Sequence, residues 1–107
     1  MKRKEYVYWN IRNKITRGDI MEKLLIVEDD NDLREWLAFT FRSEKYEAIR
    51  ADTVKKAKEC LRQTDVQGII LDCNLPDGNG FELCKQLREK SDIPIMILTA
   101  RDGIRWN

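Results

Sequence analysis

The sequence contains no histidine among its 107 residues, which excludes imidazole catalysis and any metal site built on histidine ligands. Its three cysteines, Cys60, Cys73 and Cys84, are odd in number and form no Cys-x-x-Cys pair. Such cysteines are typical of reduced thiols in a cytoplasmic protein and argue against a disulfide framework or a metal site. We interpret Cys73 as a packing residue rather than a redox switch.

The sequence also lacks an apolar run that is long enough to span a membrane. Its N-terminus is basic but has neither the apolar core nor the small-residue cleavage site of a secretory signal. The net charge of +1 gives no argument for nucleic-acid binding. With 42% hydrophobic and 36% charged residues, the composition favours one small globular domain in the cytoplasm.

The first 20 residues differ in charge from the rest of the chain. They carry six Lys or Arg against two acids, whereas residues 21–107 carry fourteen against seventeen. Three interpretations remain open: a weakly ordered tail, a basic aromatic arm that contacts nucleic acid or an anionic surface, and a translated leader. The third arises because residues 17–19 can be encoded by a purine-rich run a few bases before the Met21 codon, where a bacterial ribosome-binding site would lie. We therefore divide the chain into an extension, 1–20, and a domain, 21–107.

Short apolar runs alternate with amphipathic segments in residues 21–107. We expect strands at 23–28, 46–50, 68–72 and 94–99. We expect helices over about 31–44, from a cap at Asp52 or Thr53 to about 63, and over about 80–90. The predicted inward-facing side chains are Leu33, Trp36, Leu37 and Phe41 in the first helix, Val54, Ala57 and Leu61 in the second, and Phe81, Cys84 and Leu87 in the third.

This regular β-α alternation predicts an α/β fold with parallel strands joined by right-handed crossovers. The continuous apolar run at 94–99 is typical of a strand that is covered on both faces. In open sheets of this kind, reactive groups gather beyond the carboxyl ends of the strands. The residues at those ends are therefore the candidates for a functional site.

Acidic residues stand at two of these ends. The first strand is followed by Glu28 and Asp29, and the third ends in Asp72. If the two strands are neighbours, these three carboxylates converge and repel one another, and a hard divalent cation would remove that penalty. Mg²⁺ takes few oxygen ligands from protein and keeps water and phosphate oxygens for the rest. The cluster therefore predicts a place where Mg²⁺ holds a phosphoryl group.

Asp72 is the predicted nucleophile. A carboxylate that attacks phosphorus forms an aspartyl phosphate, and such transfer requires mainly positioning and charge neutralisation. The fourth strand ends in Thr99, whose hydroxyl can donate to a phosphoryl oxygen, and the small Ala100 leaves room beside it. A lone Asp at a strand end is more often a cap or turn residue. The acid pair, the Asp-x-x-x-Pro turn and the strand-end Thr together are more specific.

Three segments, LLIVEDD at 24–30, LDCNLPDGNG at 71–80 and ILTAR at 97–101, together resemble the receiver domain of bacterial two-component response regulators. The similarity is greatest to the subfamily whose receivers carry winged-helix DNA-binding domains, and it covers about residues 23–102. It implies a flavodoxin-like (CheY-like) three-layer α/β fold with the strand order 2-1-3-4-5. It also implies no enzymatic activity beyond self-phosphorylation and autodephosphorylation.

The resemblance further implies roles for individual residues. A sensor histidine kinase would phosphorylate Asp72, with Mg²⁺ held by Asp29, Asp72 and the backbone carbonyl of Asn74, and with Glu28 assisting through water. Thr99 would be the switch residue that turns toward the phosphoryl group. The side chain of Asn74 implies a short-lived phosphoryl group, because an amide two positions after the acceptor can hold a water near phosphorus. Pairing between two receivers is a further implied partnership.

The pattern departs from the family after Arg101. Receivers continue with a helix, a strand that ends in Lys followed by Pro, and a last helix, whereas no Lys follows Thr99 in this sequence. We therefore expect a partial receiver that lacks the last helix-strand-helix unit. We also expect an uncovered sheet edge at 94–98 and one missing counter-ion for the phosphoryl group.

Two other functions are alternatives to a phospho-acceptor module. One is a truncated, signalling-inactive fragment that acts only through protein–protein interaction. The other is a flavodoxin-like binder of a small ligand, which is disfavoured because an acid cluster, not a Gly-rich phosphate loop, follows the first strand. Because the sequence encodes no output domain, we expect this chain to make no direct contact with DNA or with a membrane.

Overall fold

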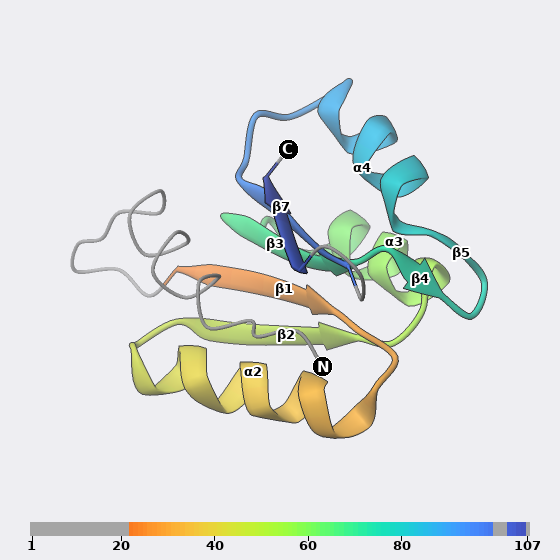
Figure 1. The fold of residues 1–107 in the computed structure, drawn as a ribbon. Coiled ribbons are helices and arrows are strands. Elements are labelled where there is room, and N and C mark those ends of the chain that lie inside the picture. Colours follow the sequence, from red (N-terminus) through yellow and green to blue (C-terminus); the bar gives the residue numbers. More distant parts are fainter. Residues whose placement is uncertain (1–21, 100–102, 107) are drawn as a thin grey trace.

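The computed structural model describes residues 22–98 with their side chains, and Thr99 and residues 103–106 as backbone (Figure 1). The strands of its main sheet are β1 (Lys23–Val27), β2 (Glu47–Ala51), β3 (Gly68–Asp72), β6 (Ile95–Thr99) and β7 (Gly103–Trp106). The helices are α2 (Asn31–Ser43), α3 (Val54–Gln63) and α4 (Gly80–Arg88). The four predicted strands and three predicted helices are therefore confirmed, with boundaries that differ by a few residues.

The strand order is β2-β1-β3-β6-β7, and the first four strands are parallel. This part of the order is the one that the receiver resemblance implies. Each parallel connection contains one helix, as expected for β-α-β units. The neighbouring position of β1 and β3, on which the predicted acid cluster depends, is confirmed.

Polar side chains begin each helix. The carboxylate of Asp30 accepts from the backbone N–H of Leu33, and the hydroxyl of Thr53 accepts from that of Lys56, both at 3.0 Å. Asn79 does the same for α4, accepting from the N–H of Phe81 at 2.6 Å. These side chains satisfy backbone donors that have no acceptor within the helix, which explains where the helices start.

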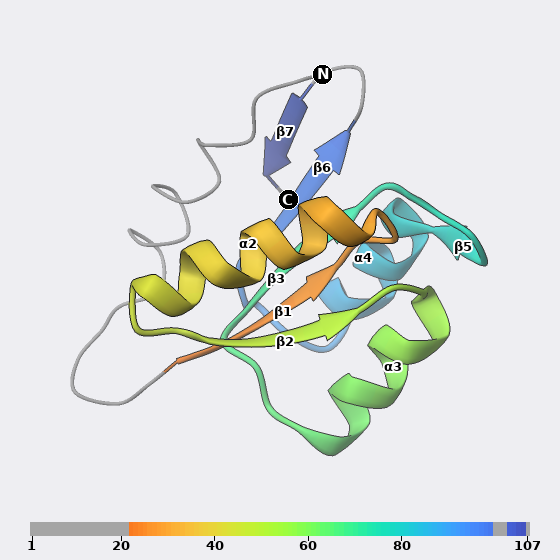
Figure 2. The same cartoon turned by 90° about the horizontal axis from the view of Figure 1, so that it is seen from below.

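Helix α2 lies on one face of the sheet, and α3 and α4 lie on the other (Figures 1 and 2). Successive strand residues point to opposite faces, so β1, β3 and β6 each supply side chains to both cores. The α2 side contains Leu24, Ile26, Leu37, Ala38, Phe41, Tyr46, Ile70, Met96 and Leu98. The other side contains Leu25, Val27, Ala51, Ala57, Val66, Ile69, Leu71, Cys73, Leu75, Leu83, Cys84, Ile95 and Ile97. The expectation that the 94–99 strand is buried on both faces is confirmed for Ile95–Leu98, all with 0% exposure.

Two aromatic residues that were predicted to face inward do not. Trp36 is 49% exposed and Phe81 is 37% exposed. Each lies at the edge of its helical stripe, because one residue along a helix turns the side chain by about 100°. The buried residues include Leu37, directly after Trp36 in α2, and Leu83, two positions after Phe81 in α4. Leu83 was not among the predicted core residues.

The prediction of an uncovered edge at 94–98 is wrong. Strand β7 pairs antiparallel with β6, with Met96 opposite Trp106 and Thr99 opposite Gly103. A hairpin return of the chain thus occupies the fifth sheet position, where the resemblance implies a parallel strand. The backbone groups of β6 are paired on both sides, which removes the expected pairing hazard at this strand.

The predictions for residues 1–20 lie outside the described residues, and the division of the chain near Met21 stays a prediction. Within the part that the structure describes, no helix has the length and apolar character needed to cross a bilayer.

A second, two-stranded unit follows β3. It consists of β4 (Asn74–Leu75) and β5 (Gly78–Asn79), which pair antiparallel around a tight turn. The chain then returns so closely to β3 that a Cβ at Gly80 would lie 2.2 Å from the backbone oxygen of Asp72. The N–H of Gly80 also donates to the carbonyl of Cys73 at 3.0 Å. Only a residue without a side chain allows α4 to begin here.

We predict that Gly80→Ala lowers the free energy of unfolding by about 2–3 kcal/mol, because the added methyl meets backbone that cannot move aside. Urea unfolding monitored by circular dichroism measures this loss. Gly78→Ala is the matched control: its Cβ would lie 3.0 Å from Cγ2 of Val54, a side chain that can shift. It is expected to lose less than about 1 kcal/mol. Equal losses in the two variants would contradict the close approach at Gly80.

Candidate functional site

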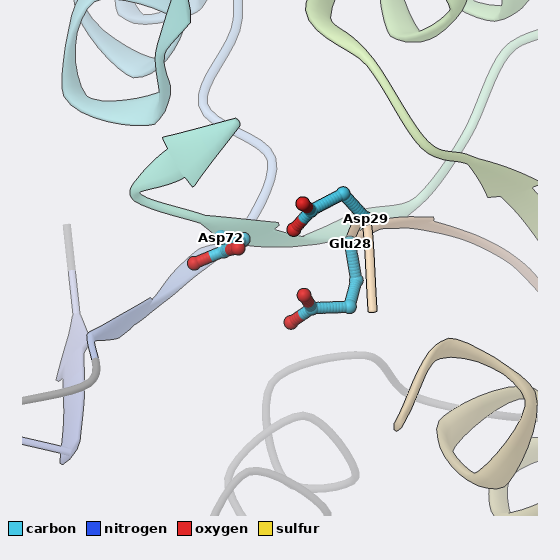
Figure 3. A group of neighbouring side chains, drawn as sticks. All are labelled: Glu28, Asp29 and Asp72. Carbon is cyan, nitrogen blue, oxygen red and sulfur yellow. The ribbon is translucent and has the colours of Figure 1, made fainter. Parts of the chain in front are cut away.

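Three acidic side chains meet at the carboxyl edge of the sheet. In the pairing of β1 with β3, Val27 lies opposite Leu71. The residues after these two, Glu28 and Asp72, therefore lie at the same edge of the sheet. One carboxylate oxygen from each of Glu28, Asp29 and Asp72 lies within 4.8 Å of the other two. Figure 3 shows the two acids of the β1 end beside Asp72 of β3. The structure therefore brings together the three carboxylates that the sequence analysis selected.

The three differ in burial. Glu28 is 3% exposed, Asp72 is half-buried and Asp29 is exposed. A donor that arrives from solvent can reach Asp72 and Asp29 more easily than Glu28. The cluster is thus open on one side and closed on the other.

Hydrogen bonds fix the β1 end of the cluster. The Oε2 atom of Glu28 accepts from the N–H of Asp30 at 3.0 Å, and the N–H of Glu28 donates to the carbonyl of Ala51 at 3.0 Å. From α2, Nη1 of Arg34 donates to the carbonyl of Glu28 at 2.9 Å. Arg34 also donates to Oδ1 of Asn31. The carboxylate and the backbone of Glu28 are therefore both held before any ligand arrives.

The β3 end is equally constrained. The N–H of Cys73 donates to the carbonyl of Leu98 at 3.1 Å, which ties the residue after Asp72 to β6. The N–H of Asn74 donates to Oδ1 of Asp72 at 3.3 Å. Asp72 thus ends a buried strand and begins a closed hairpin. The backbone on either side of it is therefore held in place.

This donor set suits a hard divalent cation. All three side chains offer carboxylate oxygens, and like charges this close cost free energy unless a cation compensates them. Mg²⁺ prefers oxygen ligands and keeps several waters, which an open cluster allows. The residues present therefore fit a magnesium site, in which Glu28, Asp29 and Asp72 would hold the ion.

Two further predicted site residues are placed only in part. Asn74 is exposed and begins β4, directly beside Asp72. Thr99 is the last residue of β6 and follows Leu98, the register partner of Asp72, so its backbone lies at the same edge. The side chain of Thr99 lies outside the described residues, and its role stays a prediction.

The sequence analysis missed Asp77. Its Oδ1 accepts from the N–H of Val54 at 2.8 Å, and its Oδ2 accepts from that of Lys55 at 3.1 Å. The hydrogen bond from Val54 is the largest of the effects that hold the pKa of the Asp77 carboxyl below its usual value. In the sequence, Asp77 is only one residue of a Pro-Asp-Gly turn. Nothing in that pattern indicates a contact with a helix start 23 residues away.

Arg34 was missed as well, because a charged residue on a helix is usually read as part of a solvated face. Cys60, Cys73 and Cys84 form no disulfide with one another, and burial raises the pKa of the Cys84 thiol. That the thiols are reduced in the cell stays a prediction. The expected packing role of Cys73 agrees with its place among the buried residues next to α3 and α4.

Comparisons with known proteins agree with this geometry. A family model described as the response regulator receiver domain matches residues 24–105. The sensory transduction protein RegX3 of Mycobacterium tuberculosis is 40% identical over 86 residues, which cover 78% of this chain and 37% of that protein. This chain spans about a third of the length of the curated relatives that it matches.

Solved structures give the same picture. The non-phosphorylated receiver domain of HemR from Leptospira biflexa has a TM-score of 0.71 at 37% identity, covering 77% of this chain and 67% of that one. The response regulator TrrA from Thermotoga maritima, solved in complex with Mg²⁺ and BeF, has a TM-score of 0.72 at 30% identity. That match covers 77% of this chain and 72% of the other.

We predict that Asp72→Asn stabilises the metal-free protein, because it removes one of three like charges held within 4.8 Å. The expected gain in the free energy of unfolding is on the order of 1 kcal/mol at low salt. Urea unfolding in the presence of a chelator measures it. Asp65→Asn removes an exposed acid from the loop before β3 and should leave stability nearly unchanged. A loss of stability in Asp72→Asn would show that the cluster is not repulsive.

Proposed function

Because this chain belongs to the family of response regulator receiver domains, we propose that it accepts a phosphoryl group on Asp72 from a sensor histidine kinase, with Mg²⁺ bound at Glu28, Asp29 and Asp72. The convergence of the three carboxylates at the carboxyl edge of β1 and β3 is the observation that carries this proposal. The family supports the class of reaction, and the geometry supports the choice of residues.

Asp72 suits the role of acceptor better than its two neighbours. It ends β3, the strand between β1 and β6, and its backbone is paired with Leu98 of β6. Glu28 is 3% exposed and therefore less accessible to a donor. Asp29 is exposed and lies in the loop after β1, where its backbone has no strand partner. The held backbone of Asp72 and its partial exposure together favour it as the acceptor.

In the proposed step, a carboxylate oxygen of Asp72 attacks phosphorus while the P–N bond of the donor phosphohistidine breaks. The leaving imidazole takes up a proton, and the product is a mixed anhydride of carboxylic and phosphoric acid. A bound Mg²⁺ would neutralise the charge that the phosphoryl oxygens bring to the acid cluster. The hydrogen bond from the N–H of Asn74 to Oδ1 of Asp72 orients the carboxylate.

Three finer roles extend the proposal. The backbone carbonyl of Asn74 serves as a further magnesium ligand, and the hydroxyl of Thr99 donates to a phosphoryl oxygen. The side-chain amide of Asn74 is exposed next to the acceptor, where it can hold a water near phosphorus. We therefore propose a short-lived phosphoryl group. Pairing with a second receiver domain is a further proposed partnership, and it rests on the family alone.

We predict that the purified chain, incubated with Mg²⁺ and a small acyl-phosphate donor, gains one acid-stable, base-labile phosphoryl group. Intact-mass spectrometry measures the adduct. Asp72→Asn should abolish it, because the amide is not a nucleophile toward phosphorus. Asp29→Asn and a metal chelator should each slow its formation by at least about tenfold, since both weaken charge neutralisation. Asp65→Asn should react like the unchanged chain.

Two results would contradict this proposal. A folded chain that forms no adduct would favour a fragment that acts only through protein–protein interaction. An adduct that persists in Asp72→Asn would place the acceptor at another residue. Circular dichroism spectra of each variant establish that the compared proteins are folded.

A further inference from the structure

The turn between β4 and β5 docks on the start of helix α3. Asp77, at this turn, accepts hydrogen bonds from the N–H groups of Val54 and Lys55, at 2.8 and 3.1 Å. Backbone donors in the first turn of a helix have no acceptor within the helix. Thr53 serves the next donor, that of Lys56, so Asp77 supplies two acceptors that the local sequence does not. The contact joins segments that lie far apart in the chain (Figure 1).

A second contact lies beside this one. A Cβ at Gly78 would be only 3.0 Å from Cγ2 of Val54, so the backbone of the turn lies directly against the first residue of α3. The docking therefore combines a carboxylate that accepts two hydrogen bonds with close packing of the backbone. A carboxylate at a helix N-terminus is also favoured by the positive end of the helix dipole.

The docked hairpin leads directly to the acid cluster. Asn74 pairs with Asn79 across the hairpin, and its N–H donates to Oδ1 of Asp72. The N–H of Gly80 closes the far side by donating to the carbonyl of Cys73. The segment from Asp72 to Gly80 is thus one closed unit, with the acceptor at its base and Asp77 at its tip. The hairpin pairing therefore connects the tip with Asn74.

We propose that Asp77 is a positioning residue, which couples the start of helix α3 to cation binding at the acid cluster by holding the hairpin that carries Asn74. The inference rests on the proposed function, since it assumes that Mg²⁺ binds at Glu28, Asp29 and Asp72. It extends that function to a side chain that touches neither the cation nor the phosphoryl group.

A simple helix cap would stabilise α3 without affecting the cluster, and the two roles predict different results. Coupling between two sites is reciprocal: if docking of Asp77 favours Mg²⁺ binding, Mg²⁺ binding must favour docking by the same factor. A structural cap predicts no effect of Mg²⁺ on the first turn of α3. The amide protons of Val54 and Lys55 report on the docked state directly.

The first measurement is Mg²⁺ titration of the full chain by calorimetry. Asp77→Ala is expected to raise the dissociation constant for Mg²⁺ by about tenfold, the low end of the effect of losing a side chain that supports a metal ligand. Asp77→Asn keeps one acceptor oxygen in place and should fall between Asp77→Ala and the unchanged chain. Asp65→Asn removes the same charge elsewhere and should change the constant by less than about twofold.

The second measurement is amide hydrogen exchange in the unchanged chain with and without saturating Mg²⁺. Mg²⁺ should slow exchange at Val54 and Lys55, and it should have no such effect in Asp72→Asn, which lacks one carboxylate of the cluster. This measurement needs no variant at position 77, so it stands even where Asp77→Ala fails to fold.

The outcomes separate the two proposals. The positioning role alone is overturned if the chain binds Mg²⁺ equally well with and without Asp77 and if Mg²⁺ does not change amide exchange at Val54 and Lys55. A folded, unchanged chain that binds no Mg²⁺ overturns the proposed function and the positioning role together. Weaker binding in Asp77→Ala with Mg²⁺-dependent protection of the two amides supports both.

Discussion

The mutual repulsion of Glu28, Asp29 and Asp72 is the constraint on which the arrangement of this domain depends. The pairing of β1 with β3 holds three carboxylates within 4.8 Å, where like charges cost free energy in the absence of a cation. The strands can hold them because Leu24–Val27 and Ile69–Leu71 are completely buried, so the hydrophobic sheet opposes the repulsion. A divalent cation bound among the three carboxylates would relieve this repulsion.

The loops around the cluster are held by contacts that lie outside it. Arg34 of α2 holds the carbonyl of Glu28, and Gly80 lets α4 begin against the backbone of Asp72. Asp77 fastens the β4–β5 hairpin to α3. Each of the three helices thus contributes one contact that fixes the acidic edge. The helices serve as covers of the hydrophobic core and as supports for the site.

Much of this fold follows from patterns that act over short distances. The apolar runs and helical stripes predicted the strands and helices. The convergence of Glu28, Asp29 and Asp72 was predicted on the condition that β1 and β3 are neighbours, which the family resemblance implied. Patterns of this kind do not specify which side of an apolar helix face packs against the sheet. Trp36 and Phe81 were therefore wrongly placed in the core. The pairing of β7 with β6 and the hydrogen bonds of Asp77 each join separate segments of the chain. These interactions stabilise the protein only once the fold has brought the segments together, so no local sequence pattern predicts them.

Identification of the modified residue bears most directly on the role of Asp72. Borohydride reduces an aspartyl phosphate to homoserine, and tandem mass spectrometry of the digested, phosphorylated chain then locates that homoserine. The geometry of the cluster predicts homoserine at position 72 alone, and much less of it after omission of Mg²⁺. Homoserine at Asp29 or Asp77, or none in a chain that has gained a phosphoryl group, would contradict the assignment of Asp72 as the acceptor.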